Sequence, residues 1–267
     1  MNDNNHSQIR LTIIGITGRM GRAVAMQARS SFTITGAIAS DSSRYIGKTL
    51  SEVGISPLQT VIEGPEAIRD VASRSDAVIS FTNPEAEVKN AKKLSEAGVA
   101  TLIGTTGFNE EQRALLIKTL SNLPLLISPN FSLGATALLV LSRASASMLT
   151  DFDFSIVEMH HSAKKDSPSG TARQIAEAVM EKRGYNSIIN GRSGISLRKQ
   201  EEMEVLSVRG GGNPGLHTVI ANGQYEYIRL EHQVLSRDAF AAGALHAAKW
   251  LVKKEPGVYS MEDVLGF

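Results

Sequence analysis

Short apolar runs alternate with longer stretches of helical periodicity through the first half of the chain. The runs have the length and β-branched content of buried strands, and they cover residues 11–14, 32–38, 76–80, 99–103 and 125–127. Apolar residues at helical spacing predict helices over residues 19–29, 84–97 and 109–120. This alternation predicts crossover connections and a parallel sheet that helices cover on both faces.

The pattern changes close to Phe131 and Ser132. A strand over 152–159 leads to a helix over 171–182, and three strand-like runs then follow without a helix between them, at 204–209, 216–221 and 225–233. Gly, Asn and Pro residues separate these runs, which predicts a small, mainly antiparallel sheet carrying one helix. Helical periodicity returns from Arg237, and this last helix could pack on either domain.

Composition narrows the classes of partner. The 267 residues contain 42% hydrophobic and 21% charged residues with a formal net charge of +1, so we expect neither nucleic acid nor a membrane as the main partner. The sequence has no cysteine, which excludes disulfides, thiolate catalysis and cysteine-based zinc sites and fits a reducing cytoplasm. The first eight residues are polar, so we expect a loose tail rather than a signal peptide. The apolar stretch 133–141 breaks at Ser142 and Arg143 and is too short to span a bilayer, which predicts a soluble protein.

A glycine-bearing turn joins the first predicted strand to the first predicted helix. It reads G-I-T-G-R-M-G from Gly15 to Gly21. A pyrophosphate needs bare backbone N–H groups and the positive end of a helix dipole. Gly18 and Gly21 match the last two glycines of G-x-G-x-x-G, whereas Gly15 lies one residue early. Glycine also serves ordinary turns, but the place between strand and helix favours dinucleotide binding.

Residues after the second strand would meet the adenosine ribose. Asp41 could accept a hydrogen bond from the 2′-hydroxyl of NADH. Alternatively, Ser40, Arg19 and Arg44 could cradle the extra phosphate of NADPH. A solvated loop is the plainer interpretation of Asp41. The pattern therefore leaves open whether the cofactor is NADPH or NADH.

Two further turns follow predicted strands at the same edge of the sheet, where open parallel sheets bind their ligands. They are G-T-T-G at 104–107 and S-P-N-F at 128–131. Small residues there would let the nicotinamide and its ribose lie close to the backbone. Tight loops without a ligand are the alternative.

The densest polar segment runs from Glu158 to Thr171 and reads E-M-H-H-S-A-K-K-D-S-P-S-G-T. Hydride arriving on carbon leaves negative charge on the neighbouring atom, so a nearby acid must supply a proton. Histidine and lysine can do this near neutral pH. His160, His161 and Lys164 are therefore candidates for reducing a carboxylated C=N or C=C substrate.

The same segment ends where a helix is expected to begin. Ser169, Gly170 and Thr171 would bind a carboxylate through free N–H groups at the helix N-terminus. Each feature also has a plain structural explanation, since adjacent histidines face opposite sides of a strand and Ser169 could be only a helix cap. Their convergence within fourteen residues, on a chain that also carries a dinucleotide turn, favours a catalytic site. Without cysteine or a paired-histidine helix motif, we expect no metal.

These motifs resemble the dihydrodipicolinate reductase family in their order and over nearly the whole chain. The residues that carry the resemblance are 15–21, 104–107, 128–132 and 158–172. It implies an α/β fold with a Rossmann-type dinucleotide-binding domain over 1–131, completed by a C-terminal helix over 238–267. It also implies a smaller α+β domain over 132–237 that binds the substrate and forms a homotetramer. The implied reaction is NADH- or NADPH-dependent reduction of 4-hydroxy-tetrahydrodipicolinate to tetrahydrodipicolinate, with loss of water, in lysine and diaminopimelate biosynthesis.

The resemblance also implies residue roles by matching position. His160 and Lys164 would be the catalytic proton donors. The residues that would hold the substrate carboxylates are His161, Lys164, Ser169, Gly170 and Thr171. Those that would line the cofactor are Gly15, Ile16, Thr17, Gly18, Arg19, Met20, Ser40, Asp41, Gly104, Thr105, Thr106, Ser128, Pro129, Asn130 and Phe131.

Two departures and two rival functions qualify these expectations. Many family members have an acidic residue followed by arginine where this chain has Ser40 and Asp41, and Ser128-Pro129 replaces the small residues often found before the asparagine.

Another Rossmann-type small-acid dehydrogenase would share the first domain, although an aspartate-semialdehyde enzyme would need a cysteine nucleophile. A non-catalytic NAD(P) sensor would bind cofactor without turnover.

Overall fold

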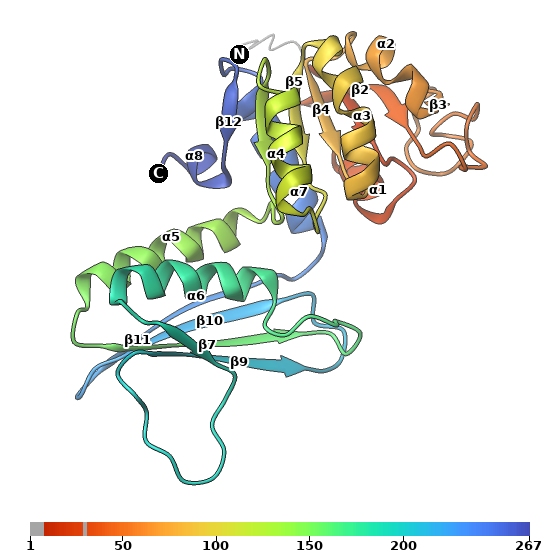
Figure 1. Ribbon diagram of the computed structural model, residues 1–267. Helices are drawn as coiled ribbons and strands as arrows, with labels where there is room; N and C mark the ends of the chain where they lie inside the picture. The colour runs from red at the N-terminus through yellow and green to blue at the C-terminus, as the bar shows by residue number, and fades with distance from the viewer. Residues whose placement is uncertain (1–7, 29–30) are drawn as a thin grey trace, which may run out of the picture. The chain divides into compact units, whose positions relative to one another are not determined.

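The computed structural model describes residues 8–28 and 31–267, so most of the expected N-terminal tail lies outside the described residues. The chain divides into two compact units. The first unit comprises the residues up to Ser132 and those from Phe240 to Gly266, and the second comprises Leu133–Ala239. Figure 1 labels most of the elements of both units.

The first unit contains a seven-stranded sheet in which every pairing is parallel. Its strands are β1 (Ile9–Ile14), β2 (Phe32–Ile38), β3 (Ile62–Glu63), β4 (Ala77–Ser80), β5 (Ala100–Ile103), β6 (Pro124–Ile127) and β12 (Gly257–Tyr259). The spatial order is β12-β6-β5-β4-β1-β2-β3. Apart from the added β12, this is the order of a Rossmann fold.

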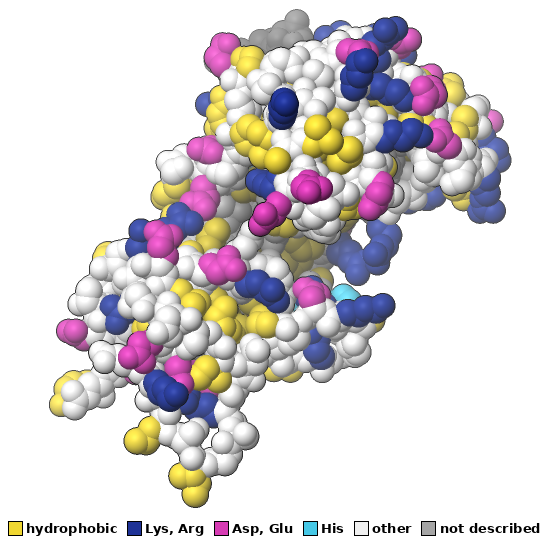
Figure 2. Space-filling model, in the orientation of Figure 1, with side chains coloured by type: hydrophobic (Ala, Val, Ile, Leu, Met, Phe, Trp, Pro, Cys, Tyr) yellow, Lys and Arg dark blue, Asp and Glu magenta, His cyan; other side chains and the backbone are white. Residues whose placement is uncertain are grey.

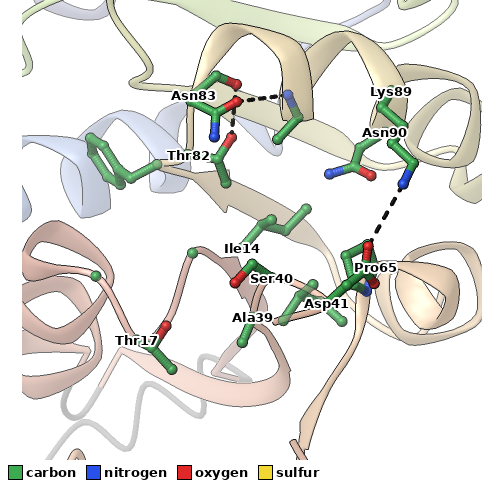
Figure 3. Close-up of a pocket in the computed structure, with 15 residues that line it drawn as sticks. Ile14, Thr17, Ala39, Ser40, Asp41, Pro65, Thr82, Asn83, Lys89 and Asn90 are labelled. Atoms are coloured by element: carbon green, nitrogen blue, oxygen red, sulfur yellow. Dashed lines mark hydrogen bonds and ion pairs between the residues drawn. The ribbon is translucent and has the colours of Figure 1, made fainter. Parts of the chain in front are cut away.

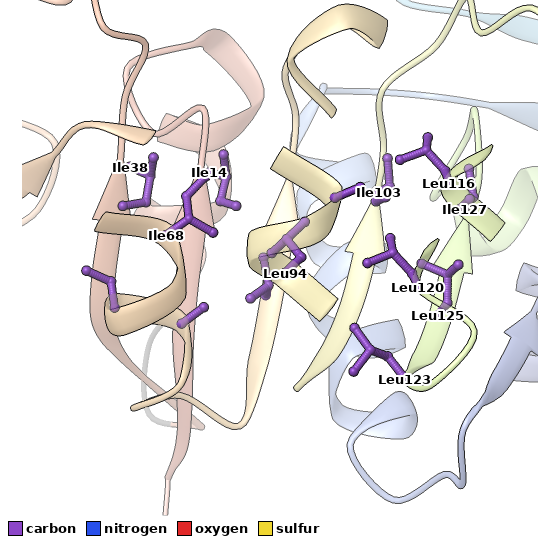
Figure 4. Close-up of a cluster of buried hydrophobic side chains, with 14 residues drawn as sticks. Ile14, Ile38, Ile68, Leu94, Ile103, Leu116, Leu120, Leu123, Leu125 and Ile127 are labelled. Atoms are coloured by element: carbon purple, nitrogen blue, oxygen red, sulfur yellow. The ribbon is translucent and has the colours of Figure 1, made fainter. Parts of the chain in front are cut away.

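Every residue of β4 and β5 is buried, although neighbouring side chains of a strand point to opposite faces of the sheet. Both faces of this sheet are therefore covered, and helices provide the cover. The helical elements of the unit are α1 (Arg19–Gln27), η1 (Pro65–Ala67), α2 (Ile68–Ala72), α3 (Pro84–Ala97), α4 (Glu110–Thr119), α7 (Asp238–Leu251) and α8 (Met261–Leu265). In the core cluster of Figure 4, Ile68, Leu94 and Leu116 of α2, α3 and α4 meet strand side chains such as Ile14 and Ile103.

Helix starts follow the local sequence. Asn83 caps α3 by accepting a hydrogen bond from the Ala86 N–H at 2.9 Å, and Pro84 occupies the first turn, where its missing N–H is not needed. Asn109 and Gln112 form a reciprocal capping box at the start of α4. These caps fix the chain directly after β4 and close to the end of β5, where a ligand would bind.

The second unit contains a five-stranded sheet with the order β11-β10-β7-β9-β8. Its strands are β7 (Asp153–His160), β8 (Ser187–Ile189), β9 (Glu202–Arg209), β10 (Leu216–Asn222) and β11 (Tyr227–Gln233). The expectation of a mainly antiparallel sheet was wrong, because β7 pairs with β9 and β8 with β9 in parallel. The helix after β7 is a crossover that returns the chain in the same direction, as parallel strands require.

Two helices pack on this sheet instead of the one expected. They are α5 (Leu133–Met148) and α6 (Gly170–Arg183), and both supply side chains to one apolar core with β7, β9 and β10. Sequence analysis treated Ser142 and Arg143 as a break in the apolar run. The helix continues through them, and the buried Ser142 hydroxyl is satisfied by donating to the Leu138 carbonyl at 2.6 Å, one turn earlier.

The expected C-terminal helix over 238–267 is shorter in the structure. Helix α7 ends at Leu251, and β12 and α8 follow it. Pro256 cannot continue a helix, and Ser260 and Asp263 form a capping box that starts α8 anew. The chain therefore returns to the first unit as a helix, a sheet strand and a second helix.

Charged side chains of both signs lie on the surface (Figure 2). On the face shown in Figure 2, Lys and Arg side chains are interspersed with Asp and Glu, in keeping with the net charge of +1. No helix within the described residues is long and apolar enough to cross a membrane.

Candidate active site

A cavity of about 340 Å³ lies at the carboxyl ends of β1, β2 and β4 in the first unit (Figure 3). The strand order reverses between β1 and β4, since β2 and β3 extend the sheet on one side and β5, β6 and β12 on the other. Open α/β sheets bind ligands at such a switch point. The volume is within the range of small-molecule and cofactor sites.

The glycine turn forms one wall of this cavity. Gly15 has a φ of +79°, and a Cβ there would lie 2.1 Å from the Phe81 carbonyl oxygen. A Cβ on Gly21 would lie 2.2 Å from the Gly15 carbonyl oxygen. Neither position tolerates a side chain, and α1 begins directly after Gly18 without a side-chain cap. The turn therefore presents bare backbone and a helix N-terminus, as a pyrophosphate requires.

The opposite wall carries charge and an unsatisfied acceptor. Asp41, which follows β2, lies 3.7 Å from the Lys89 ammonium of α3, measured from Oδ2 to Nζ, and Figure 3 shows this contact. Asn90 also lines the cavity and is 4% exposed, and its Oδ1 has no hydrogen-bond partner among the described residues. A buried acceptor of this kind suits a ligand that brings a donor.

Phe81, after β4, connects the two remaining predicted turns with the glycine turn. A Cβ on Gly104 would lie 2.1 Å from the Phe81 ring, so only glycine fits there. The Phe131 ring meets the Phe81 ring edge-on, with centroids 5.9 Å apart. The carbonyl of Phe81 excludes a side chain at Gly15, as described above. One residue thus holds the loops after β1, β5 and β6 at one edge of the sheet.

A buried carboxylate holds the loops after β4 and β5 together. Oε1 of Glu87 accepts hydrogen bonds from the hydroxyls of Ser80 at 2.7 Å, Thr82 at 2.6 Å and Thr105 at 2.7 Å. In the loop after β6, the Ser128 hydroxyl donates to the Asn130 carbonyl at 2.7 Å. These polar side chains shape the loops from within.

The structure therefore separates the predicted cofactor residues into two groups. Those that line the cavity are Gly15, Thr17, Gly18, Ser40 and Asp41. Those that do not line it are Ile16 of the glycine turn, Arg19 and Met20 at the start of α1, and Gly104, Thr105, Thr106, Ser128, Pro129, Asn130 and Phe131 of the loops after β5 and β6. Ile16 is fully buried, and its N–H donates to the Ile38 carbonyl at 3.1 Å.

Charged side chains meet at the end of β7 in the second unit. Glu158 and His160 share the buried face of this strand, and Oε2 of Glu158 lies 2.5 Å from Nδ1 of His160. Arg209, the last residue of β9, donates to both Glu158 oxygens, at 2.7 and 2.9 Å. Burial alone would raise the pKa of Glu158, but hydrogen bonds from His160 and Arg209 hold it far below its ordinary value. Glu158 is therefore an anion at neutral pH.

Ser169, the N-cap of α6, joins this cluster through its backbone and its hydroxyl. Its N–H donates to Oε1 of Glu158 at 3.2 Å, and its Oγ accepts from the Ala172 N–H at 3.2 Å. The same Oγ lies 3.1 Å from Nε2 of His217. Burial, and after it the proximity of His160, lowers the pKa of His217 to about 4. His217 is thus a neutral neighbour of His160, packed edge-on at a centroid distance of 5.2 Å.

The segment between β7 and α6 carries Lys164 and His161. Nζ of Lys164 lies 2.8 Å from Oδ1 of Asp166, and the Lys164 N–H donates to the His161 carbonyl at 3.1 Å. Burial alone would raise the pKa of Asp166, but its hydrogen bond with Lys164 holds the pKa below the usual range. His161 is half-buried and has more solvent contact than His160.

Helix α6 begins beside these residues. Gly170 is its first residue, is exposed, and has open space around the position of a Cβ, while Thr171 is half-buried. The helix spans 14 residues, so its N-terminus carries the partial positive charge that favours an anion. Within the ranges that the structure describes, no group of three or more His, Cys, Asp or Glu side chains could hold a metal ion.

Models of one protein family match both halves of the chain. A family model described as "Dihydrodipicolinate reductase, N-terminus" matches residues 9–131, and one described as "Dihydrodipicolinate reductase, C-terminus" matches residues 134–265. The chain belongs to the dihydrodipicolinate reductase family.

Relatives in this family are similar over almost their full length. A protein named 4-hydroxy-tetrahydrodipicolinate reductase from Methanopyrus kandleri is 43% identical over 265 residues, which cover 96% of each chain. One of the same name from Aquifex aeolicus is 39% identical over 97% of this chain and 99% of its own. The expected family is therefore confirmed.

Solved structures share the fold. A dipicolinate-bound dihydrodipicolinate reductase from Paenisporosarcina sp. TG-14 has a TM-score of 0.74 at 23% identity, covering 95% of this chain and 97% of its own. An amine dehydrogenase from Mycobacterium smegmatis has a TM-score of 0.67 at 14% identity, covering 96% of both chains. The expected Rossmann-type fold with a smaller second sheet is confirmed, and the second likeness shows that enzymes named for another reaction share it.

Sequence analysis missed several residues of both clusters. Asn90 and Lys89 lie on a helix without a recognisable motif, and Arg209 and His217 lie on strands assigned only by their apolar pattern. Phe81 alone had a usable signal, because it directly follows a buried strand that ends at the same sheet edge as the glycine turn. Arg209 and His217 are brought to their site by the pairing of β9 and β10 with β7, and Lys89 and Asn90 by the position of α3 directly after β4.

Proposed function

We propose that this chain reduces 4-hydroxy-tetrahydrodipicolinate to tetrahydrodipicolinate with a reduced nicotinamide cofactor, in the synthesis of lysine and diaminopimelate. The observation that carries the proposal is the buried His160–Glu158 pair beside Lys164 and the N-terminus of α6. It offers proton donors and a carboxylate site in one segment. The names of the relatives at 43% and 39% identity support the same reaction.

The residues of the first unit fit a dinucleotide. Gly15 and Gly18 line the cavity without side chains, so a pyrophosphate could approach the backbone there, and the unsatisfied Oδ1 of Asn90 could accept from the adenine or ribose. When bound, the cofactor supplies the hydride. The loops after β5 and β6, which carry Gly104–Thr106 and Ser128–Phe131, would support its nicotinamide end.

Either phosphorylation state of the cofactor has a partner in the cavity. Asp41 would accept hydrogen bonds from the free ribose hydroxyls of NADH. Lys89, released from its pair with Asp41, would face the 2′-phosphate of NADPH, and Ser40 would add a hydroxyl donor. We therefore propose that the enzyme accepts both NADH and NADPH.

In the second unit, His160 and Lys164 would act as the proton donors that complete reduction and loss of water. His161 and Lys164 would bind one carboxylate of the substrate. Gly170 and Thr171 would bind the other through N–H groups at the start of α6. Ser169 is 2% exposed and bonded to Glu158 and His217, so it would shape this carboxylate site from beneath.

We propose a cytoplasmic homotetramer built on the open face and edge of the mixed sheet. Helices α5 and α6 cover the other face. Val208 and Ile228 are both 42% exposed, and Tyr225 and Tyr227 are also exposed, so large apolar side chains of β9 and the β10–β11 hairpin lack cover within one chain.

A coupled assay tests the proposed reaction. Pyruvate and aspartate semialdehyde passed through the preceding synthase supply fresh substrate, and oxidation of NADH or NADPH is followed by absorbance. We expect oxidation that requires the synthase and is lost in Lys164→Ala. Cofactor binding without oxidation would instead favour a sensor, and oxidation only with other small acids or amines would favour a different dehydrogenase on the same fold.

A further inference from the structure

Arg209 binds two separate parts of the candidate catalytic segment with one guanidinium group. Its terminal nitrogens hold both carboxylate oxygens of Glu158, at 2.7 and 2.9 Å. One of them, Nη2, also donates to the backbone carbonyl of Asp166 at 2.7 Å. Arg209 is 51 residues from Glu158 and 43 from Asp166 along the chain, so β7–β9 pairing brings them together.

Each part held by Arg209 leads to one member of the catalytic pair. The Glu158 carboxylate contacts Nδ1 of His160. Nε2 is therefore the ring nitrogen that can meet a ligand. Asp166, whose backbone carbonyl Arg209 holds, forms an ion pair with Lys164, with Oδ1 2.8 Å from Nζ. The path from His160 to Lys164 therefore passes through Arg209 and needs no contact between the two catalytic side chains.

Gly215 keeps space beside Nε2 of His160. It has a φ of +152°, and a Cβ there would lie 3.1 Å from that nitrogen. The Gly215 carbonyl accepts from the Val234 N–H at 2.8 Å, which fixes this backbone in place. Glu158 thus holds His160 by Nδ1, and the missing side chain of Gly215 avoids a close contact at Nε2.

We propose that Arg209 is a positioning residue that sets His160 and Lys164 in one geometry, through Glu158 and the backbone of Asp166. This inference rests on the proposed reductase activity for its kinetic test. The guanidinium suits the task because its planar fork meets two carboxylate oxygens and still has an N–H for a carbonyl. A lysine would keep the charge without the fork.

The kinetic test compares Arg209→Lys with Glu158→Gln in the full-length enzyme. Arg209→Lys should lower kcat about 100-fold and also raise KM for the dicarboxylate about tenfold, because small misplacements of reacting groups have effects of this size. Glu158→Gln should lower kcat similarly but leave this KM within about twofold, since the Asp166 carbonyl stays held. In both variants KM for the cofactor should stay unchanged.

Arg192→Lys is a matched control. Arg192 also pairs with a buried carboxylate of the second unit, Glu202, at 2.6 Å, and its side chain is 25% exposed against 20% for Arg209. We expect kcat and both KM values of this variant within about twofold of wild type. The proposal is overturned if Arg209→Lys behaves like Arg192→Lys. It is also overturned if Arg209→Lys impairs cofactor and dicarboxylate KM alike, which indicates general loss of structure.

A spectroscopic test separates this inference from the proposed reaction. The hydrogen bond between Glu158 and Nδ1 of His160 should give a low-field ring-proton signal in wild type and Arg192→Lys, assigned by its loss in His160→Gln. It should disappear in Glu158→Gln and shift or broaden in Arg209→Lys. An unchanged signal in Arg209→Lys overturns the positioning role whether or not the enzyme turns over the dicarboxylate.

Discussion

The cavity of the first unit and the polar cluster of the second depend on different features of their residues. The cavity depends on missing side chains, since Gly15 and Gly18 present bare backbone to it and the only ion pair on its wall, among the described residues, is the solvent-exposed Asp41–Lys89 contact. The cluster depends on buried charge, with Glu158 fully covered and bonded to His160, Arg209 and Ser169. The first should therefore be sensitive to added volume, and the second to lost charge or hydrogen bonding.

The largest expected effect follows from removing the acid in the second unit. His160→Gln should lower kcat about 10³-fold, because a positioned acid contributes about 10²–10⁴-fold to proton transfer. Cofactor affinity should stay within about twofold, since the cavity belongs entirely to the first unit. Steady-state kinetics and a cofactor titration measure the two quantities, with the exposed His246→Gln as control. Equal losses of kcat and cofactor affinity would contradict the division of labour.

A pH effect on stability should come from the second unit. The pKa of His217 is about 4 in the folded state and about 6.5 when unfolded, so between these values the unfolded state binds more protons. Stability should be fully present above pH 6.5 and should fall by about 3 kcal/mol as the pH drops to 4. Urea unfolding of wild type and His217→Gln at several pH values tests this. The variant should lose that part of the slope, and parallel curves would show that His217 does not cause it.

A single added methyl group should show how sensitive the cavity is to added volume. Gly15 and Gly47 both have positive φ, at +79° and +83°, but a Cβ at Gly47 would meet nothing within 4 Å. Gly47→Ala should therefore cost about 1 kcal/mol of unfolding free energy from the backbone alone. Gly15→Ala should cost about 2 kcal/mol more because the Phe81 carbonyl must shift, and it should weaken cofactor binding. Equal costs by urea unfolding would mean that the close approach does not matter.

The smallest expected effect concerns the exposed pair on the cavity wall. Lys89→Met should weaken NADPH about fivefold relative to NADH, and Asp41→Ala should weaken NADH relative to NADPH by a similar factor, since exposed charges contribute little. Binding constants for both cofactors measure the ratio. Lys92→Met on the same helix does not line the cavity and serves as control. An unchanged ratio in both variants would remove this pair from cofactor selection.

Features that depend on local sequence could be predicted from sequence patterns. The parallel sheet and its main helices follow from local periodicity, and β2 and α3 match their predicted ranges at 32–38 and 84–97. The glycine turn was recognisable because its function depends on residue type at fixed spacing. The motif around His160 was recognisable for the same reason.

The remaining features depend on contacts distant along the chain. No local signal reports that Arg209 will meet Glu158, because their approach depends on the pairing register of β7 with β9. The three-residue strand β8 and the late strand β12 are too short for an alternating pattern, and their partners define them. Helix α5 was not predicted because the apolar run was taken to end at Ser142 and Arg143, and the hydrogen bond that lets Ser142 be buried exists only once the helix has formed.

The path of the chain through its two units also constrains how the protein is made. The first unit is interrupted after Ser132 and resumes at Phe240, so α7 and β12 are synthesised only after the whole second unit. During translation, β6 therefore remains an unprotected sheet edge until β12 leaves the ribosome and pairs with it. The length of this exposure is set by translation through the intervening second unit, because β12 cannot pair with β6 before it is synthesised.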